Sequence, residues 1–243
     1  MRRKNNMPVD FISDKIYKLD YIAWKKELLQ LPIFNSGEIQ KLYLDKWIEI
    51  LMVQDALACD FYSKPEVKML MLKEKEEAPE NFQIPINYET NTMFIHFRVS
   101  RIIQMMEQVG VPLDDAIDID IKEFTDKNTR INWTPTTDIV KIKKQPIIIV
   151  PLTVDKFYQL LVIDGNHRIT HAIAKNEKSV KAFLLYPNVL VEGKLFSTGF
   201  DKFLYIFQNE IIALASYIHR DGYSDEKAIE LAYFYSEKVQ YYI

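Results

Sequence analysis

Glycine is scarce in this chain, at 6 of 243 residues, whereas a typical soluble protein has about 7%. A fold with many tight turns, such as a β-sandwich or a propeller, needs glycine where other residues would be strained. The scarcity therefore predicts that helices dominate. Hydrophobic residues make up 48% of the chain and aromatic residues 13%, which is typical of a folded domain and not of a disordered segment.

The charge balance bears on possible partners. The chain has 31 Lys and Arg residues against 34 Asp and Glu residues, a formal net charge of -3. DNA-binding domains usually show a basic excess. Nucleic acid is therefore a disfavoured partner. Any contact with it would need a local cluster of basic residues.

Cysteine and hydropathy bear on location. Cys59 is the single cysteine, which excludes an internal disulfide and suits the reducing cytoplasm. The basic N-terminal residues lead into polar sequence and not into the apolar core of a signal peptide. The most apolar stretch, residues 203–218, contains Gln208, Asn209 and Glu210 and is shorter than the ~20 residues of a membrane span. We therefore expect a cytoplasmic protein with no membrane partner.

The order of apolar patterns predicts helices, then strands, then helices. Helical spacing extends over residues 10–72, where Asn35 and Ser36 offer N-cap side chains for an internal helix, and over 92–109. Alternating or β-branched runs predict strands at 116–121, 147–150, 158–163 and 180–185, with an antiparallel hairpin turn at 153–157. Helices are also predicted from Thr134, over 201–219, and over 224–242 with Ser224 as N-cap.

These elements predict an α+β fold. Residues 1–112 would form a helical N-terminal region, 113–192 a small mixed-sheet domain, and 193–243 C-terminal helices that pack on it. The aromatic C-terminal segment would pack the last helix, and it would also suit a homodimer face. The aromatic residues concerned are Tyr233, Phe234, Tyr235, Tyr241 and Tyr242.

Residues 160–174 carry the strongest functional signal. An apolar run ends at Asp164 and Gly165, and apolar residues then recur at spacings of three and four from Ile169. A strand that turns on glycine into a helix presents unpaired backbone N–H groups and the positive end of the helix dipole. That combination binds anions, so phosphate is the expected ligand.

The side chains of this turn suit phosphate chemistry. Arg168 offers a forked cation, and His167 donates a hydrogen bond or moves a proton near neutral pH. Asp164 would orient His167, hold a phosphate-bound metal or act as a base. His171 lies one helical turn beyond His167. The structural alternative is that Asp-Gly only shapes a turn, that Arg168 pairs with a carboxylate, and that His167 is solvated.

This segment resembles the ParB/sulfiredoxin superfamily. The turn Asp164-Gly165-Asn166-His167-Arg168 is similar to a G-x-H-R motif between a strand and a helix, and the P-I-I-I-V run at 146–150 fits the P-I-x-V strand that precedes it by one hairpin. The resemblance covers roughly residues 115–190. It implies a nucleotide whose phosphates contact the four residues from Gly165 to Arg168.

Within that superfamily, the turn is most similar to that of free serine kinases, which use a carboxylate base from an upstream loop. Glu123 and Asp126 are the candidates here. Sulfiredoxins have a cysteine where this chain has Asn166, so the resemblance does not imply sulfinic acid reduction. ParB proteins bind DNA through a later helix-turn-helix domain, whereas residues 201–243 are rich in aromatic and acidic residues, which disfavours a role in DNA segregation.

We therefore predict a nucleotide-binding enzyme that hydrolyses ATP or CTP, or transfers its phosphoryl group to a small-molecule acceptor, with Mg²⁺ as cofactor. The catalytic residues would be Asp164, His167 and Arg168, with Asp164 also holding the metal. The nucleotide-binding residues would be Gly165, Asn166, His167, Arg168 and His171. Two alternatives stay open: a ParB-like nuclease or DNA-binding protein, and an interaction protein that nucleotide binding switches without turnover.

Overall fold

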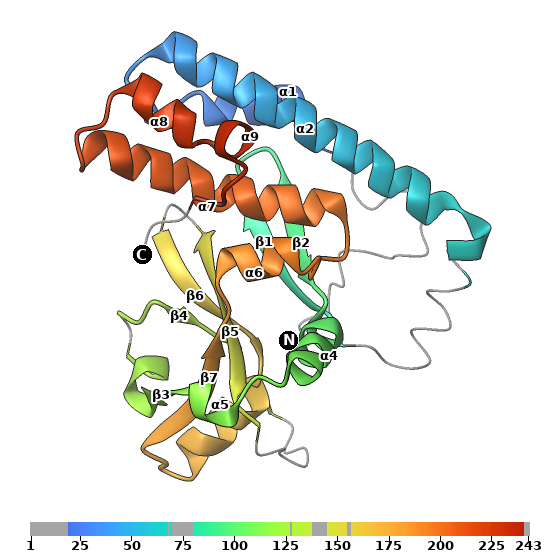
Figure 1. Ribbon diagram of the computed structural model, residues 1–243, viewed down its shortest axis with the longest axis vertical. Coiled ribbons are helices and arrows are strands. Elements are labelled where there is room, and N and C mark those ends of the chain that lie inside the picture. The colour runs from blue at the N-terminus through green and yellow to red at the C-terminus, as the bar shows by residue number, and fades with distance from the viewer. Residues whose placement is uncertain are drawn as a thin grey trace.

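The computed structural model describes residues 19–67, 69, 80–126, 128–137, 145–154 and 157–240, and it has an α+β fold (Figure 1). Its α-helices are α1 (Tyr21–Leu28), α2 (Gly37–Ser63), α4 (Val99–Val109), α5 (Asn166–Ala174), α6 (Pro187–Glu192), α7 (Gly199–His219), α8 (Asp225–Leu231) and α9 (Tyr233–Ser236). Its strands are β1 (Phe82–Asn87), β2 (Thr92–Phe97), β3 (Ile117–Asp120), β4 (Ile131–Asn132), β5 (Ile147–Val154), β6 (Phe157–Asp164) and β7 (Ser179–Leu184).

Both ends of the described chain contribute to one helical layer, in which α1, α2, α7, α8 and α9 lie together (Figure 1). Aromatic rings fill this layer: the ring of Phe207 on α7 lies 5.5 Å from that of Trp47 on α2 and 5.7 Å from that of Trp24 on α1. Such contacts add to the free energy gained by burying the rings. No helix in the described ranges has both the length and the apolar character needed to cross a membrane.

Helices α1, α2, α7 and α8 begin where a side chain accepts one of their first N–H groups. Ser36, one of the two candidates, caps α2, and Ser224 caps α8 as predicted. Thr198 and Asp201 form a reciprocal capping box at the start of α7. Each cap fixes where a long helix starts and therefore how its apolar face is aligned with the layer below.

The predicted helix over 224–242 is interrupted, because a buried carboxylate binds the chain in its middle. Glu210 on α7 accepts hydrogen bonds from Tyr43 Oη and Trp47 Nε1, both at 2.9 Å, and from the backbone N–H of Tyr233 at 2.6 Å. Ala232 adopts an extended conformation between α8 and α9. Burial raises the pKa of Glu210 to about 7.

The sheet has the strand order β3-β7-β5-β6-β4. β5 pairs antiparallel with β6, as the predicted hairpin requires, although residues 155 and 156 of its turn lie outside the described residues. β4 runs parallel to β6, so both strands end at the same edge of the sheet. The predicted strands at 116–121, 147–150, 158–163 and 180–185 are confirmed as β3, β5, β6 and β7.

Strand β5 is buried on both faces, which is why it is a continuous apolar run. Ile148 and Val150 belong to the large core under the helical layer. Ile147 and Ile149 belong to a smaller core with Ile169 of α5 on the opposite face. The sheet therefore separates an extensive aromatic core from a smaller one that is mostly aliphatic and includes Phe124.

The predicted helix over 92–109 is wrong in its first third. Residues 92–97 form β2, which pairs with β1 in a hairpin, and α4 begins only at Val99. The side chains of Met93, Ile95 and Phe97 are fully buried at a spacing of two, the period of a strand. The region 1–112 is therefore not entirely helical. The predicted helix start at 134–138 is irregular as far as Thr137, and residues 138–144 lie outside the described residues.

Candidate functional site

The turn between β6 and α5 depends on Gly165. Its φ angle is +103°, a conformation that other residues rarely adopt. A Cβ atom at this position would lie 2.4 Å from Cγ2 of Ile147 at the start of β5. Only glycine therefore lets the chain turn directly from the sheet edge into a helix.

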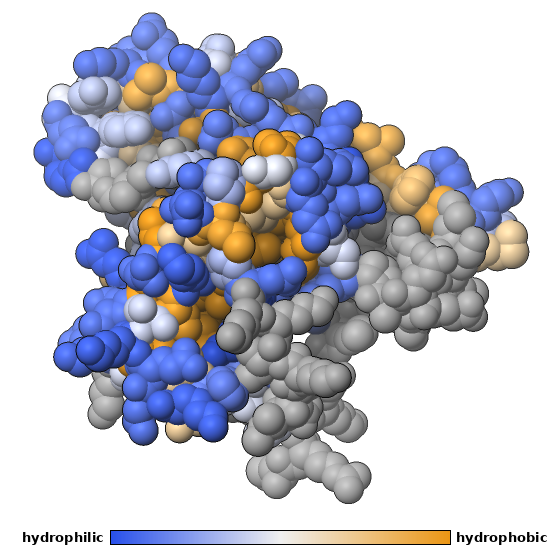
Figure 2. Space-filling model, turned by 60° about the horizontal axis from the view of Figure 1, so that its bottom comes forward, coloured by the Kyte–Doolittle hydropathy of each residue, from blue (hydrophilic) through white to orange (hydrophobic). Residues whose placement is uncertain are grey.

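Helix α5 opens at this edge without a side-chain cap. Gly165 occupies the N-cap position, and within the described residues no side chain accepts a hydrogen bond there as a cap. The first N–H groups of a helix need acceptors and carry the positive end of its dipole. Seen from below, the part of the surface around α5 is mostly hydrophilic (Figure 2). The turn therefore offers an anion both N–H donors and a polar surface.

Arg168 makes contacts within the protein. Its guanidinium donates from Nη2 to Oδ2 of Asp164 at 2.5 Å, and from Nη1 to the carbonyl oxygens of Gln145 and Pro146 at 2.6 and 2.9 Å. The side chains of Arg168 and Asp164 are each only 14% exposed. Arg168 therefore ties α5 to the end of β6 and to the segment that enters β5.

Two side chains of α5 hold a loop that follows β4. Oδ1 of Asn166 accepts the N–H of Thr134 at 2.9 Å, and Oγ1 of Thr170 accepts the N–H of Thr136 at 3.1 Å. The loop reaches the turn because β4 and β6 end at the same edge. Sequence reasoning missed this loop, since its position depends on a parallel pairing that no local pattern reveals.

The two histidines of α5 differ in environment. His167 is exposed and His171 is partly buried, while Ile169 and Ala172 bury the opposite face of the helix in the small core. The structure thus brings Asp164, Gly165, Asn166, His167 and Arg168 together at one edge, with His171 one turn further along the helix.

The two candidate bases lie elsewhere in the small domain. Glu123 and Asp126 are exposed, in and just after a 3-10 helix at Ile121–Phe124. Oδ1 of Asp126 accepts the N–H of Asn128 within its own loop. In the described residues, no hydrogen bond or ion pair joins either carboxylate to the β6–α5 turn, so neither is assigned as a base.

The described residues do not form a protein-held magnesium site. A metal-ligand group of three or more His, Cys, Asp or Glu side chains does not occur among them. Oδ2 of Asp164 accepts from Arg168. Because Mg²⁺ in nucleotide sites binds phosphate oxygens and water as well as one or two carboxylates, this donor set gives no basis for deriving a step through the metal.

Comparisons with known proteins do not assign a family. The chain matches no model of a protein family, no curated protein and no solved structure.

Proposed function

We propose that this protein binds the phosphate groups of a nucleotide at the β6–α5 turn. The observation that carries the proposal is Gly165, which has a φ of +103° at the end of a strand and begins a helix without a side-chain cap within the described residues. Strand-to-helix turns of this kind present backbone N–H groups to phosphate. The ParB/sulfiredoxin resemblance supports the same site.

In this proposal the main chain binds the phosphates and the side chains divide the other tasks. The N–H groups at the start of α5 donate to phosphate oxygens, and the exposed His167 donates from its ring. Asn166 and Arg168 are already bonded within the protein. We therefore assign both side chains a positioning role. For Arg168 this replaces the direct contact of the guanidinium with phosphate that was expected from the sequence, whereas the backbone N–H of Asn166 keeps its expected contact.

Turnover is the second part of the proposal. His167 would stabilise negative charge that develops on a transferred phosphoryl group, as preorganised donors do in other phosphoryl-transfer sites. Asp164, paired with Arg168, would keep the turn in the geometry that the phosphates need. Hydrolysis and transfer to a small acceptor both need the phosphates held and the developing charge stabilised. One experiment therefore tests which nucleotide binds and whether its phosphoryl group is released.

Calorimetric titration tests the binding step. MgATP, MgCTP, MgGTP and MgADP would be titrated into the wild type and into His167→Ala, with phosphate release followed in parallel. At least one nucleotide should bind, and His167→Ala should weaken it about tenfold or more, since a hydrogen bond to a charged group is lost. Arg101→Ala is the matched control, because Arg101 is an exposed cation on α4 that contacts Gln104; it should bind like the wild type.

The outcomes separate the alternatives. Binding with phosphate release supports an enzyme, and binding without release supports a nucleotide-dependent switch. Absence of binding by all four nucleotides would overturn the proposal. Salt-sensitive binding of DNA in that case would favour the nuclease or DNA-binding alternative.

A further inference from the structure

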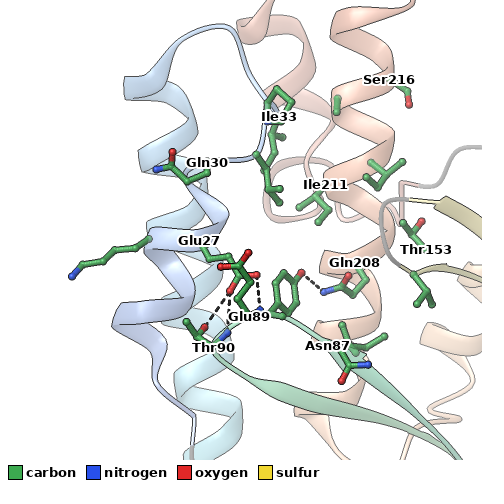
Figure 3. A pocket seen from close by; sticks show the side chains of 18 of the residues that line it. Glu27, Gln30, Ile33, Asn87, Glu89, Thr90, Thr153, Gln208, Ile211 and Ser216 are labelled. Carbon is green, nitrogen blue, oxygen red and sulfur yellow. Dashed lines mark hydrogen bonds between the residues drawn. The ribbon is translucent and has the colours of Figure 1, made fainter.

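A cavity of about 1250 Å³ lies far along β5 from the turn, on the side of the helical layer. It is open to solvent on one side and is lined by α1, the β1–β2 turn, the end of β5 and one face of α7 (Figure 3). These segments are separated by long stretches of sequence. The volume exceeds the 300–1,000 Å³ that is typical of small-molecule sites, so the space accommodates an organic ligand of several rings.

The cavity has an apolar floor. Ile33, Ile86 and Ile211 line it, and their side chains are only 2%, 3% and 4% exposed. Ile212 and Ala215 continue the same face of α7. Branched aliphatic side chains held by a packed core keep their shape when the site is empty. This floor would therefore favour a rigid hydrophobic ligand.

One buried amide lies beside this apolar floor. Gln208 is 5% exposed, and its Nε2 donates to Oη of Tyr88 at 2.6 Å. The amide oxygen thus points away from Tyr88 (Figure 3). Within the described parts of the chain, no group donates a hydrogen bond to that oxygen. The buried side-chain atoms without a partner in the described residues are Trp24 Nε1 and His96 Nε2, so the oxygen of Gln208 is accessible from the cavity. A ligand that donates a hydrogen bond to it would use this acceptor.

The charged groups around the cavity are balanced. Lys26 and Arg220 line it together with Glu27 and Glu89, so two cationic and two anionic side chains are present. The carboxylate of Glu27 accepts the N–H of Glu89 at 2.9 Å, and Arg220 forms an ion pair with Asp221. Apart from His219, the described lining residues therefore carry equal numbers of positive and negative formal charges.

We infer that this cavity binds a neutral, largely hydrophobic small molecule that donates one hydrogen bond, from an amine or hydroxyl group, to the amide oxygen of Gln208. The apolar floor supplies the affinity, the amide fixes the orientation, and the balanced charges select against ions. This site is independent of the nucleotide site, because the two share none of their residues.

Two fluorescent probes with the same skeleton test this inference. N-phenyl-1-naphthylamine is neutral and has one N–H donor, and 8-anilino-1-naphthalenesulfonate adds a single negative charge to it. Titrated into the full chain, the neutral probe should bind with at least tenfold lower Kd. Equal or tighter binding of the sulfonate would overturn the inference.

Two variants place the probe in the cavity. Ala215→Trp puts a large side chain into the lumen and should abolish binding of the neutral probe. Ala56→Trp, at an exposed position on α2, is the matched control and should leave it unchanged. Gln208→Met removes the acceptor at similar size and should weaken binding about fivefold. Thermal melting would show that each variant is folded, and undiminished binding by a folded Ala215→Trp variant would overturn the inference.

Discussion

The β6–α5 turn and the cavity are two regions built in different ways on the same sheet. The turn consists of five consecutive residues, 164–168, and its charged groups are bonded to one another and to nearby backbone. The cavity collects residues from the ranges 23–33, 86–90, 153–154 and 208–220, and its floor belongs to the large core. The turn is thus specified locally and the cavity by tertiary packing. Damage to one region should therefore leave the other intact.

The largest expected loss of stability comes from substituting Gly165. Comparison with a second glycine distinguishes steric clash from backbone strain. Gly165→Ala should lower the free energy of unfolding by about 3–5 kcal/mol, because it adds a contact with Ile147 to an unfavourable φ. Gly222→Ala has a similar φ of +71° with nothing within 4 Å of the new atom, and it should cost only about 1–2 kcal/mol. Urea denaturation measures both, and equal losses would contradict the role given to Ile147.

The next effect concerns pH and belongs to the helical layer. The pKa of Glu210 is raised in the folded state from 4.5 to about 7, so the unfolded chain loses this proton at lower pH than the folded chain. The stabilisation is full below about pH 4.5 and is lost as pH rises through 7. From pH 5 to pH 8 the free energy of unfolding should fall by roughly 2–3 kcal/mol from this group.

Comparison of wild type with Glu210→Gln isolates that contribution. Urea denaturation at pH 5 and pH 8 should show a smaller pH dependence in the variant, because glutamine does not titrate. Identical pH profiles for the two proteins would show that Glu210 does not titrate in this range. The proposed nucleotide site, on the other side of the sheet, should bind its ligand equally well in both proteins.

A smaller effect compares two arginine–aspartate pairs. Arg168→Ala should cost about 2 kcal/mol, since it leaves Asp164 and two carbonyl groups without their partner at a site that is only 14% exposed. The surface pair Arg220–Asp221 is much more exposed, so Arg220→Ala should cause no measurable loss. Thermal melting of the two variants tests this, and equal melting temperatures would contradict the clamping role of Arg168.

Local patterns predicted most of the elements around the turn. The β-branched run at 147–150 and the apolar run at 158–163 are strands, and a helix follows Gly165. These patterns are reliable because burial determines the spacing of apolar residues. A strand buried on both faces is a continuous apolar run, and a helix buried on one face has apolar residues three and four apart. Residues 92–97 were wrongly predicted as helix because some of their apolar residues continue the helical spacing of α4. They form a strand because they pair with β1.

Contacts between distant residues were beyond the reach of sequence patterns. The sequence offered only the alternative that Arg168 pairs with some carboxylate, without identifying Asp164. The bonds of Arg168 to Gln145 and Pro146 depend on how β5 enters the sheet. No sequence pattern predicted the cavity, because Gln208 is only a polar residue within an apolar helical segment. Its environment arises only when α1 and the β1–β2 turn pack around α7.

Titration of the isotope-labelled protein with MgATP or MgCTP, followed by amide NMR, tests the central claim most directly. The account predicts that the largest shift changes occur at the amides of Gly165, Asn166, His167 and Arg168, while those of Gln208 and Ala215 stay unchanged. Unchanged amides at the turn at saturating nucleotide, or changes confined to the cavity, would contradict nucleotide binding at the β6–α5 turn.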